Sequence, residues 1–142
     1  MIRYLKHKEI DKTKWDECVE NSSNGHIYVY SWYLDIVSPG WDALVHGNYE
    51  VIMPLTHRKK FGFKYLFVPF FVQQMGIIYS QDADPESNLE FLFLKKLDKC
   101  FSYSDLYLNS GNKKPERGYN VVERQNQYLS LNKIYSELFK KY

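Results

Sequence analysis

Residues 49–79, YEVIMPLTHRKKFGFKYLFVPFFVQQMGIIY, constrain the fold more than any other part of the chain. This segment is apolar on both faces, which is typical of strands at the centre of a sheet and not of a surface ribbon. Phe61-Gly62 predicts a turn and Pro69 ends a strand, so we expect strands at residues 49–56, 64–68 and 75–79. Pro54 cannot donate to a strand ladder and therefore predicts a bulge or an unpaired position.

The residues before this segment predict a strand and a helix. Residues 2–6 alternate as in a strand, and Asp11 can cap the free amides of a following helix. The apolar residues of this helix that share one side are Trp15, Cys18 and Val19.

A second helix and a hairpin are predicted next. Ser31 is the expected N-cap of a short helix at residues 32–37. A strand at residues 41–46 should then pair with residues 49–56 through a tight turn at Gly47-Asn48. The order up to this point is a strand, two helices and an antiparallel meander.

The carboxyl-terminal part predicts one long helix and weaker elements. Asp84-Pro85 is a typical helix start, and the apolar face that follows comprises Leu89, Leu92, Phe93, Lys96, Leu97 and Cys100. We also expect strands at residues 105–109 and 119–131, and a last helix capped by Asn132.

Composition limits the classes of function. The 142 residues are about one domain long, and a formal net charge of +2 gives no long-range attraction to nucleic acid or to an anionic membrane. Cys18 and Cys100 belong to no CxxC motif and are expected to be free thiols. Residues 65–72, the longest apolar run, are far short of the ~20 that a membrane helix needs. We therefore expect a soluble, cytoplasmic protein that has no membrane contact.

Motifs for common catalytic chemistry are absent from the sequence. The four histidines lack metal-ligand spacing, so no metal site is predicted. The sequence also has no GxSxG elbow, P-loop or GxGxxG motif. It therefore identifies no catalytic residue.

Residues 57–64, HRKKFGFK, form a basic and aromatic cluster. Phe61-Gly62-Phe63 matches part of an RNA-binding sheet motif, but Lys60 stands where that motif requires Gly. A basic hairpin turn is more often a solvated tip, so nucleic acid ranks low among the expected partners.

The corner Gln73-Gln74-Met75-Gly76 is a candidate ligand site. Gly permits close approach of a ligand to the backbone, and exposed amides there can hold a carbonyl, a carboxylate or a phosphate. A simple bulge between two core strands is the alternative interpretation of the same residues.

The chain resembles the amino-terminal half of GNAT-like and Fem-type N-acyltransferases. The residues that carry the resemblance are the run NGHIYVYSWYLD at residues 24–35, Trp41, VIMPL at residues 51–55, Arg58, Tyr65 and QQMG at residues 73–76. The resemblance implies one α/β domain of the α+β type over residues 1–142, with a mixed, mostly antiparallel central sheet and about four flanking helices. It also implies a second GNAT-like half or a homodimer as partner.

In this family an acyl or aminoacyl group moves from coenzyme A or tRNA to an amine. The resemblance implies acetyl-CoA or another acyl-CoA as cofactor and a small amine as acceptor. It places Gln73, Gln74 and Gly76 nearest the acyl donor or ligand, and Tyr33, Asp35 and Arg58 on the acceptor side.

Two departures from the family pattern narrow this expectation. The Lys that helps some relatives to hold an anionic sugar nucleotide is missing at Leu34-Asp35-Ile36. The glycine-rich coenzyme A loop is also incomplete, because Ile follows Gly76 where a second small residue belongs. We therefore expect an incomplete or acceptor-side half of an acyltransferase, the alternative being a non-catalytic binding or dimerisation module with the same fold.

Overall fold

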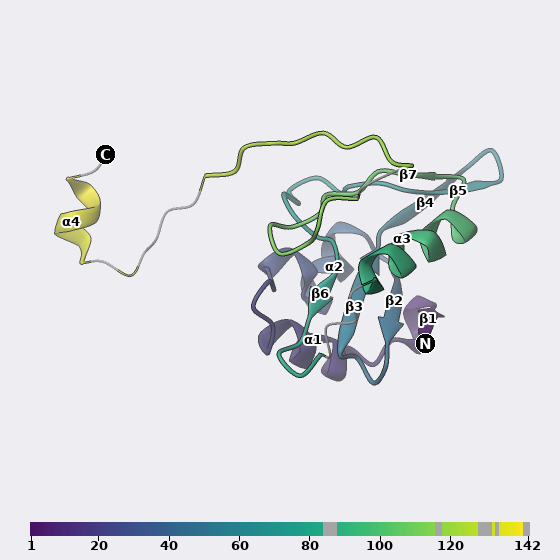
Figure 1. Cartoon of the computed structure of the whole chain (residues 1–142), viewed down its shortest axis with the longest axis horizontal. Coiled ribbons are helices and arrows are strands. Elements are labelled where there is room, and N and C mark those ends of the chain that lie inside the picture. The colour runs from purple at the N-terminus through teal and green to yellow at the C-terminus, as the bar shows by residue number, and fades with distance from the viewer. Residues whose placement is uncertain (84–87, 116–117, 128–131, 133, 141–142) are drawn as a thin grey trace.

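The computed structural model describes residues 1–83, 88–115, 118–127, 132 and 134–140. Within these ranges the chain is a mixed α+β protein with two sheets and four α-helices. Figure 1 shows the body of the molecule, with residues 119–127 leading away from it.

The four-stranded sheet has the order β1-β2-β3-β6, and all its neighbours are antiparallel. Its strands are β1 (Ile2–Leu5), β2 (Asp42–His46), β3 (Val51–Leu55) and β6 (Ile78–Tyr79). The predicted hairpin of β2 and β3 is confirmed, with Asp42 opposite Leu55 and His46 opposite Val51. Its loop spans residues 47–50 and is longer than the predicted two-residue turn.

The bulge predicted at Pro54 is wrong, whereas the alternative prediction, an unpaired position, holds on the side that faces β6. Pro54 lies opposite Ala43 in an unbroken register between β2 and β3. Pairing of β6 with β3 is limited to Val51 and Ile52, so this neighbour requires no amide from position 54.

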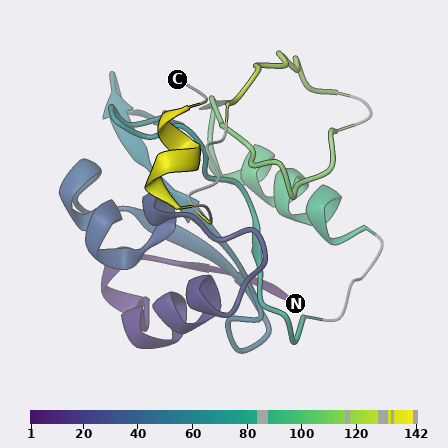
Figure 2. The same cartoon turned by 90° about the vertical axis from the view of Figure 1, so that its left-hand side faces the viewer.

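Helices cover both faces of the four-stranded sheet, as Figures 1 and 2 show together. One face packs on α1 (Lys12–Glu20) and α2 (Ser31–Val37), and the other packs on α3 (Leu89–Cys100). Alternation along β2 divides the core, because Ala43 and Val45 belong to the first cluster whereas Leu44 belongs to the second. The prediction that residues 49–79 form the centre of one sheet is confirmed for β3 only, because β6 is an edge strand and residues 57–66 belong to a second sheet.

The helix starts follow the sequence only in part. Asp11 caps α1 as predicted, because its side chain accepts a hydrogen bond from the Lys14 amide. The prediction for Ser31 is wrong, since Tyr30 is the N-cap of α2. The amide and the hydroxyl of Ser31 instead both donate to the Asp16 carboxylate, at 2.7 Å each.

The second sheet has the order β4-β5-β7 and projects beyond the body (Figure 1). It consists of β4 (His57–Lys60), β5 (Phe63–Leu66) and β7 (Tyr103–Ser104), and β5 pairs with β7 in parallel. The turn at Phe61-Gly62 is confirmed by the pairing of Lys60 with Phe63. The meander therefore continues from the first sheet into a separate second one.

Several expectations for the carboxyl-terminal part are wrong. Residues 105–109 and the described residues 119–127 form no strand. The last helix, α4 (Tyr135–Phe139), has Ile134 as N-cap in place of Asn132, and none of its residues is buried. The expected helix start at Asp84-Pro85 lies outside the described residues, and α3 begins after Asn88.

Two short 3-10 helices, His7–Glu9 and Ile27–Val29, complete the described elements. In the described ranges we find no helix with the length and apolar character that crossing a bilayer requires.

Candidate functional site

The corner at residues 73–76 is packed against another part of the chain. Gln73 is exposed, whereas Gln74 and Gly76 are buried. The backbone at Gly76 has φ 80°, which favours glycine, and a Cβ there would lie 2.1 Å from Asn112 Oδ1 and 3.2 Å from Asn109 N. The space next to Gly76 that a ligand could have approached is therefore filled by the loop at residues 108–112.

Three asparagines hold the corner in place. Asn109 Nδ2 donates to Met75 O at 2.7 Å, and Asn112 accepts from Ile77 N at 3.0 Å and donates to Ile77 O at 2.7 Å. Asn24 adds a further bond to Ile77 O at 2.9 Å. The sequence prediction missed these residues, because asparagine and glycine in a polar loop indicate turns and not their distant partners.

Tyr33 of α2 contacts the segment that precedes this corner. Its hydroxyl donates to the carbonyl of Phe71 at 2.8 Å, two residues before Gln73. The two segments that this bond joins carry exposed apolar side chains, here named the aromatic ledge together with the half-buried Tyr33: Trp32 (50% exposed) and Ile36 (71%) on α2, and Phe70 (85%) and Phe71 (87%). The structure therefore joins one predicted acceptor-side residue, Tyr33, to the segment that precedes the predicted donor-side residues.

Asp35 and Arg58 have other surroundings. Asp35 accepts hydrogen bonds from Lys12 Nζ at 2.6 Å and from Trp41 Nε1 at 3.0 Å, which joins α2 to α1 and to the residue before β2. Burial alone would raise the pKa of its carboxyl group, but these two donors hold the pKa below its usual value. The guanidinium of Arg58 on β4 lies 4.3 Å from the centre of the Phe67 ring.

A charged cluster that the sequence did not indicate joins the two sheets. Asp42 of β2 is buried and accepts hydrogen bonds from the hydroxyl of Tyr4 and from Lys64 Nζ, the latter at 2.7 Å. His57 Nε2 of β4 lies 2.9 Å from the same carboxylate oxygen. Lys64 also donates to the Tyr4 hydroxyl at 2.6 Å, and its ammonium lies 5.2 Å from the centre of the Phe101 ring.

The pKa shifts in this cluster follow from burial and pairing. Burial by itself would raise the pKa of Asp42, but its hydrogen bonds with Lys64 and Tyr4 outweigh this effect and lower it. For His57 burial is the larger effect and lowers the pKa, although the Asp42 carboxylate opposes it. Because the residues contact one another within the fold, we interpret the cluster as a junction between the sheets.

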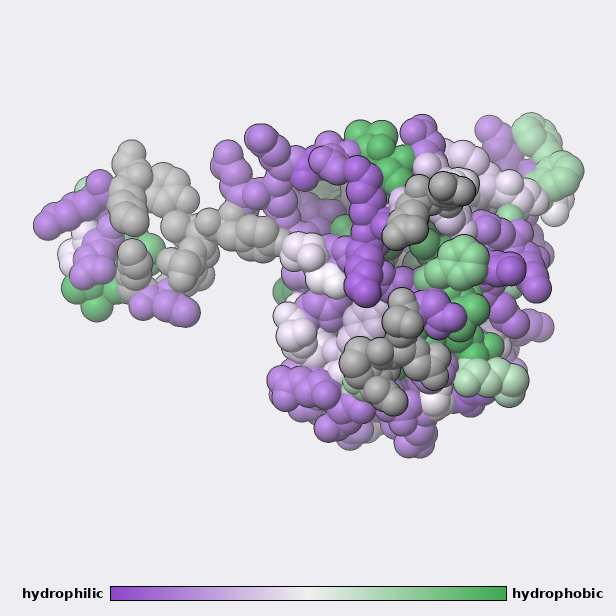
Figure 3. Space-filling model, viewed as in Figure 1, coloured by the Kyte–Doolittle hydropathy of each residue, from purple (hydrophilic) through white to green (hydrophobic). Residues whose placement is uncertain are grey.

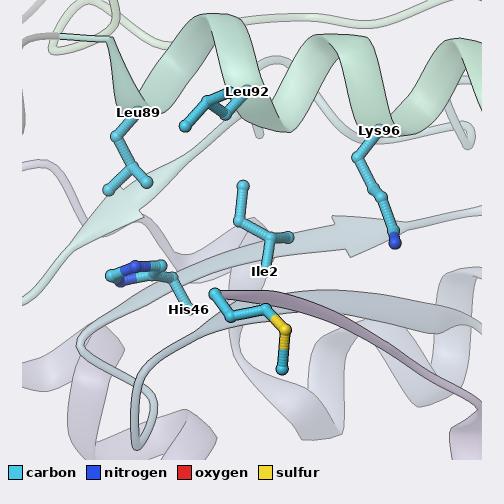
Figure 4. A pocket seen from close by; sticks show the side chains of 6 residues that line it. Ile2, His46, Leu89, Leu92 and Lys96 are labelled. Carbon is cyan, nitrogen blue, oxygen red and sulfur yellow. The ribbon is translucent and has the colours of Figure 1, made fainter.

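The described part of the chain contains shallow pockets. One, of about 270 Å³, lies between α3 and strands β1 and β2, and Figure 4 shows its lining residues Met1, Ile2, His46, Leu89, Leu92 and Lys96. Another, of about 260 Å³, is lined in part by Cys18, Tyr49 and Ser80. None of the six predicted site residues lines either of these two pockets.

Among the described residues, no group of three or more His, Cys, Asp or Glu side chains is placed to hold a metal ion. Comparison of the chain with protein-family models, with curated proteins and with solved structures gave no match.

Proposed function

We propose that this chain is the acceptor-side half of an N-acyltransferase of the GNAT-like or Fem type. The observation that carries the proposal is the hydrogen bond between Tyr33 and the Phe71 carbonyl, because it joins an acceptor-side residue to the chain two residues before Gln73, which the family resemblance places on the donor side. The order of a strand, two α-helices and antiparallel strands in the amino-terminal part agrees with the resemblance.

The aromatic ledge supports the idea of a missing half. Exposed apolar patches of this kind mark surfaces that another protein segment or a ligand covers. A covered ledge would exclude water from the exposed Gln73 and from Tyr33, whose hydroxyl could then orient an amine.

The reaction would form an amide bond from an acyl thioester and an amine, and it would release the thiol. The ammonium form of the acceptor must first lose a proton, and the five ledge residues include no carboxylate or imidazole. The base and the oxyanion-stabilising amides would therefore come from the second half.

The test is calorimetric titration with acetyl-CoA and a panel of small amines. It would use this chain and a version extended along its reading frame past Tyr142. We expect activity in the extended protein, and Tyr33→Phe should lower its kcat/KM about tenfold, the loss of one hydrogen bond. Tyr119→Phe, which removes a hydroxyl bonded to Asp98 far along the chain, is the matched control. Absence of binding heat in both proteins, together with absence of activity in the longer one, would reject the proposal.

A non-catalytic dimerisation module is the second candidate. The packing of Asn112 and Asn109 against Gly76 favours it, because the corner is then an internal contact and not a ligand site. This candidate predicts that the aromatic ledge pairs two copies of the chain. Sedimentation velocity should then show a dimer that Phe70→Ser weakens, and a monomer at every concentration would argue against it.

A further inference from the structure

The register of the second sheet collects basic and aromatic side chains on one face. Arg58 of β4 lies opposite Tyr65 of β5, which in turn lies beside Tyr103 of β7. Lys60 lies opposite Phe63 in the same way. Because side chains alternate along a strand, these residues share a face, which we name the basic-aromatic face.

The opposite face of this sheet is turned toward the body. Leu66 is buried in the core that includes α3, and Lys64 and His57 reach the Asp42 carboxylate. The basic-aromatic face is therefore the outer one. Its Phe63 and Tyr103 side chains are 66% and 65% exposed, and Arg58 and Lys60 are exposed as well.

An outer sheet face is usually polar, so exposed rings on it call for an explanation. Here Phe67 follows two residues after Tyr65 and lies under the Arg58 guanidinium, which extends the rings along β5. Figure 3 shows hydrophobic atoms next to hydrophilic ones at the far end of the β4–β5 hairpin, at the upper right. A solvated hairpin tip, the expectation from sequence, accounts for the cations but not for a row of rings.

We propose that the basic-aromatic face binds single-stranded nucleic acid. A base can stack on Tyr65 or Tyr103, and the neighbouring Arg58 can then bind a phosphate. Phe63 and the neighbouring Lys60 form a second pair of the same kind. This inference does not depend on acyl transfer.

The distribution of the rings favours nucleic acid over an anionic membrane. Phe61 in the hairpin turn is itself 88% exposed and follows Lys60, so the tip alone would also suit contact with lipid. On this face the rings continue from Phe63 near the turn to Tyr103 on the third strand, away from the tip. Asp105, the second residue after Tyr103 on the chain, is a carboxylate near the end of this row, so we expect phosphates to lie nearer Arg58 and Lys60.

The test is fluorescence anisotropy of the full chain with labelled oligouridylate and oligodeoxythymidylate of about 20 nucleotides, in about 50 mM salt. We expect both single strands to bind, and a duplex of the same length to bind more weakly because its bases are not free to stack. Tighter binding of oligouridylate would indicate RNA as the natural ligand, and tighter binding of oligodeoxythymidylate would indicate DNA.

Phe63→Ala and Tyr103→Ala should each weaken binding by about five- to a hundredfold, the effect of losing one stacked base. Neutralising Arg58 and Lys60 to Gln should lower the slope of log K against log salt by about 1.4, since each phosphate contact on a single strand contributes about 0.7. All four side chains are exposed, so these variants should fold, which circular dichroism would check.

Two matched controls test whether binding depends on this face in particular, and not on positive charge or exposed rings elsewhere on the protein. Lys59 neighbours Lys60 on β4 but points to the other side of the sheet, so Lys59→Gln should change binding less than Lys60→Gln. Phe70→Ala removes a ring that is 85% exposed on the aromatic ledge and should have no effect.

Three results would overturn the proposal. They are absence of binding to either single strand, binding that Phe63→Ala and Tyr103→Ala leave unchanged, and tight binding to vesicles of about 30% phosphatidylserine without binding to single strands. The last result would identify the face as a lipid-contacting one.

Discussion

Gly76→Ala should destabilise the protein through two separable effects. The backbone at position 76 has φ 80°, and a left-handed conformation costs a non-glycine residue about 1–2 kcal/mol. The added Cβ would also lie 2.1 Å from Asn112 Oδ1, so the Asn112 side chain must move away from its bonds to Ile77 N and Ile77 O. Loss of these two bonds costs about 1–2 kcal/mol more.

The total is about 3 kcal/mol, which for a chain of 142 residues corresponds to a fall in Tm of about 10 °C. The assay is urea denaturation followed by circular dichroism. Gly40→Ala is the matched control, because Gly40 has φ 79° and a Cβ there meets nothing within 4 Å. Gly40→Ala should therefore lower the free energy of unfolding only by the cost of the left-handed backbone conformation.

A double-mutant cycle isolates the contact with Asn112. In an Asn112→Ala background, Gly76→Ala should cost clearly less than in the parent protein, because the clashing amide is gone and only the 3.2 Å contacts with Asn109 N and Leu108 Cα remain beyond the backbone cost that Gly40→Ala measures. If Gly76→Ala and Gly40→Ala cost the same in the parent protein, the loop does not pack on the glycine and the reasoning fails.

Further predictions concern the buried ionisable groups. Asp42→Asn leaves the ammonium of Lys64 without its counter-charge and should lower the free energy of unfolding in guanidinium by about 3 kcal/mol; a change below about 1 kcal/mol would contradict the role of Asp42 as junction. Burial lowers the pKa of His57 and of His26 from 6.5, so the unfolded chain binds protons that the folded chain does not. The free energy of unfolding should therefore fall as pH decreases below about 6.5, and replacing both histidines by Gln should flatten this dependence, whereas an unchanged slope would exclude them as its source. Burial raises the pKa of the Cys18 thiol to about 12, so Ellman's reagent at about pH 8 should reach Cys18 only after unfolding, and fast labelling of Cys18 in a Cys100→Ser variant would refute its burial.

Local signals predicted the central hairpin and the first helix. The two strands of the hairpin are apolar on both sides because α1 and α2 cover one face and α3 the other, and this double burial is visible in the sequence. Asp11 could be assigned from sequence because its partner, the Lys14 amide, is three residues away. The prediction of a helix cap from sequence failed at Ser31, because its amide and its hydroxyl both donate to the carboxylate of Asp16 on another helix.

Contacts between distant strands could not be predicted. The cluster at the sheet junction draws Tyr4, Asp42, His57 and Lys64 from four strands, and no spacing along the chain relates them. For the candidate site, the corner and Tyr33 stay predictions from sequence, and the asparagines that pack against Gly76 were not predicted.

The expected strand at residues 105–109 failed for a different reason. The segment makes single hydrogen bonds to two separate parts of the chain, from Asp105 N to Leu66 O and from Met75 N to Tyr107 O. A strand needs a continuous partner, which a one-dimensional pattern does not supply.

The contacts of the Lys64 ammonium should reduce the entropy lost when a partner binds to the second sheet. A short hairpin is marginally stable by itself in water and would sample many orientations about its base. By contacting Asp42 and Tyr4, Lys64 ties the middle strand β5 to the core of the molecule. A partner that docks on β5 therefore meets side chains whose backbone is already ordered, and less of the interaction energy is lost to ordering it.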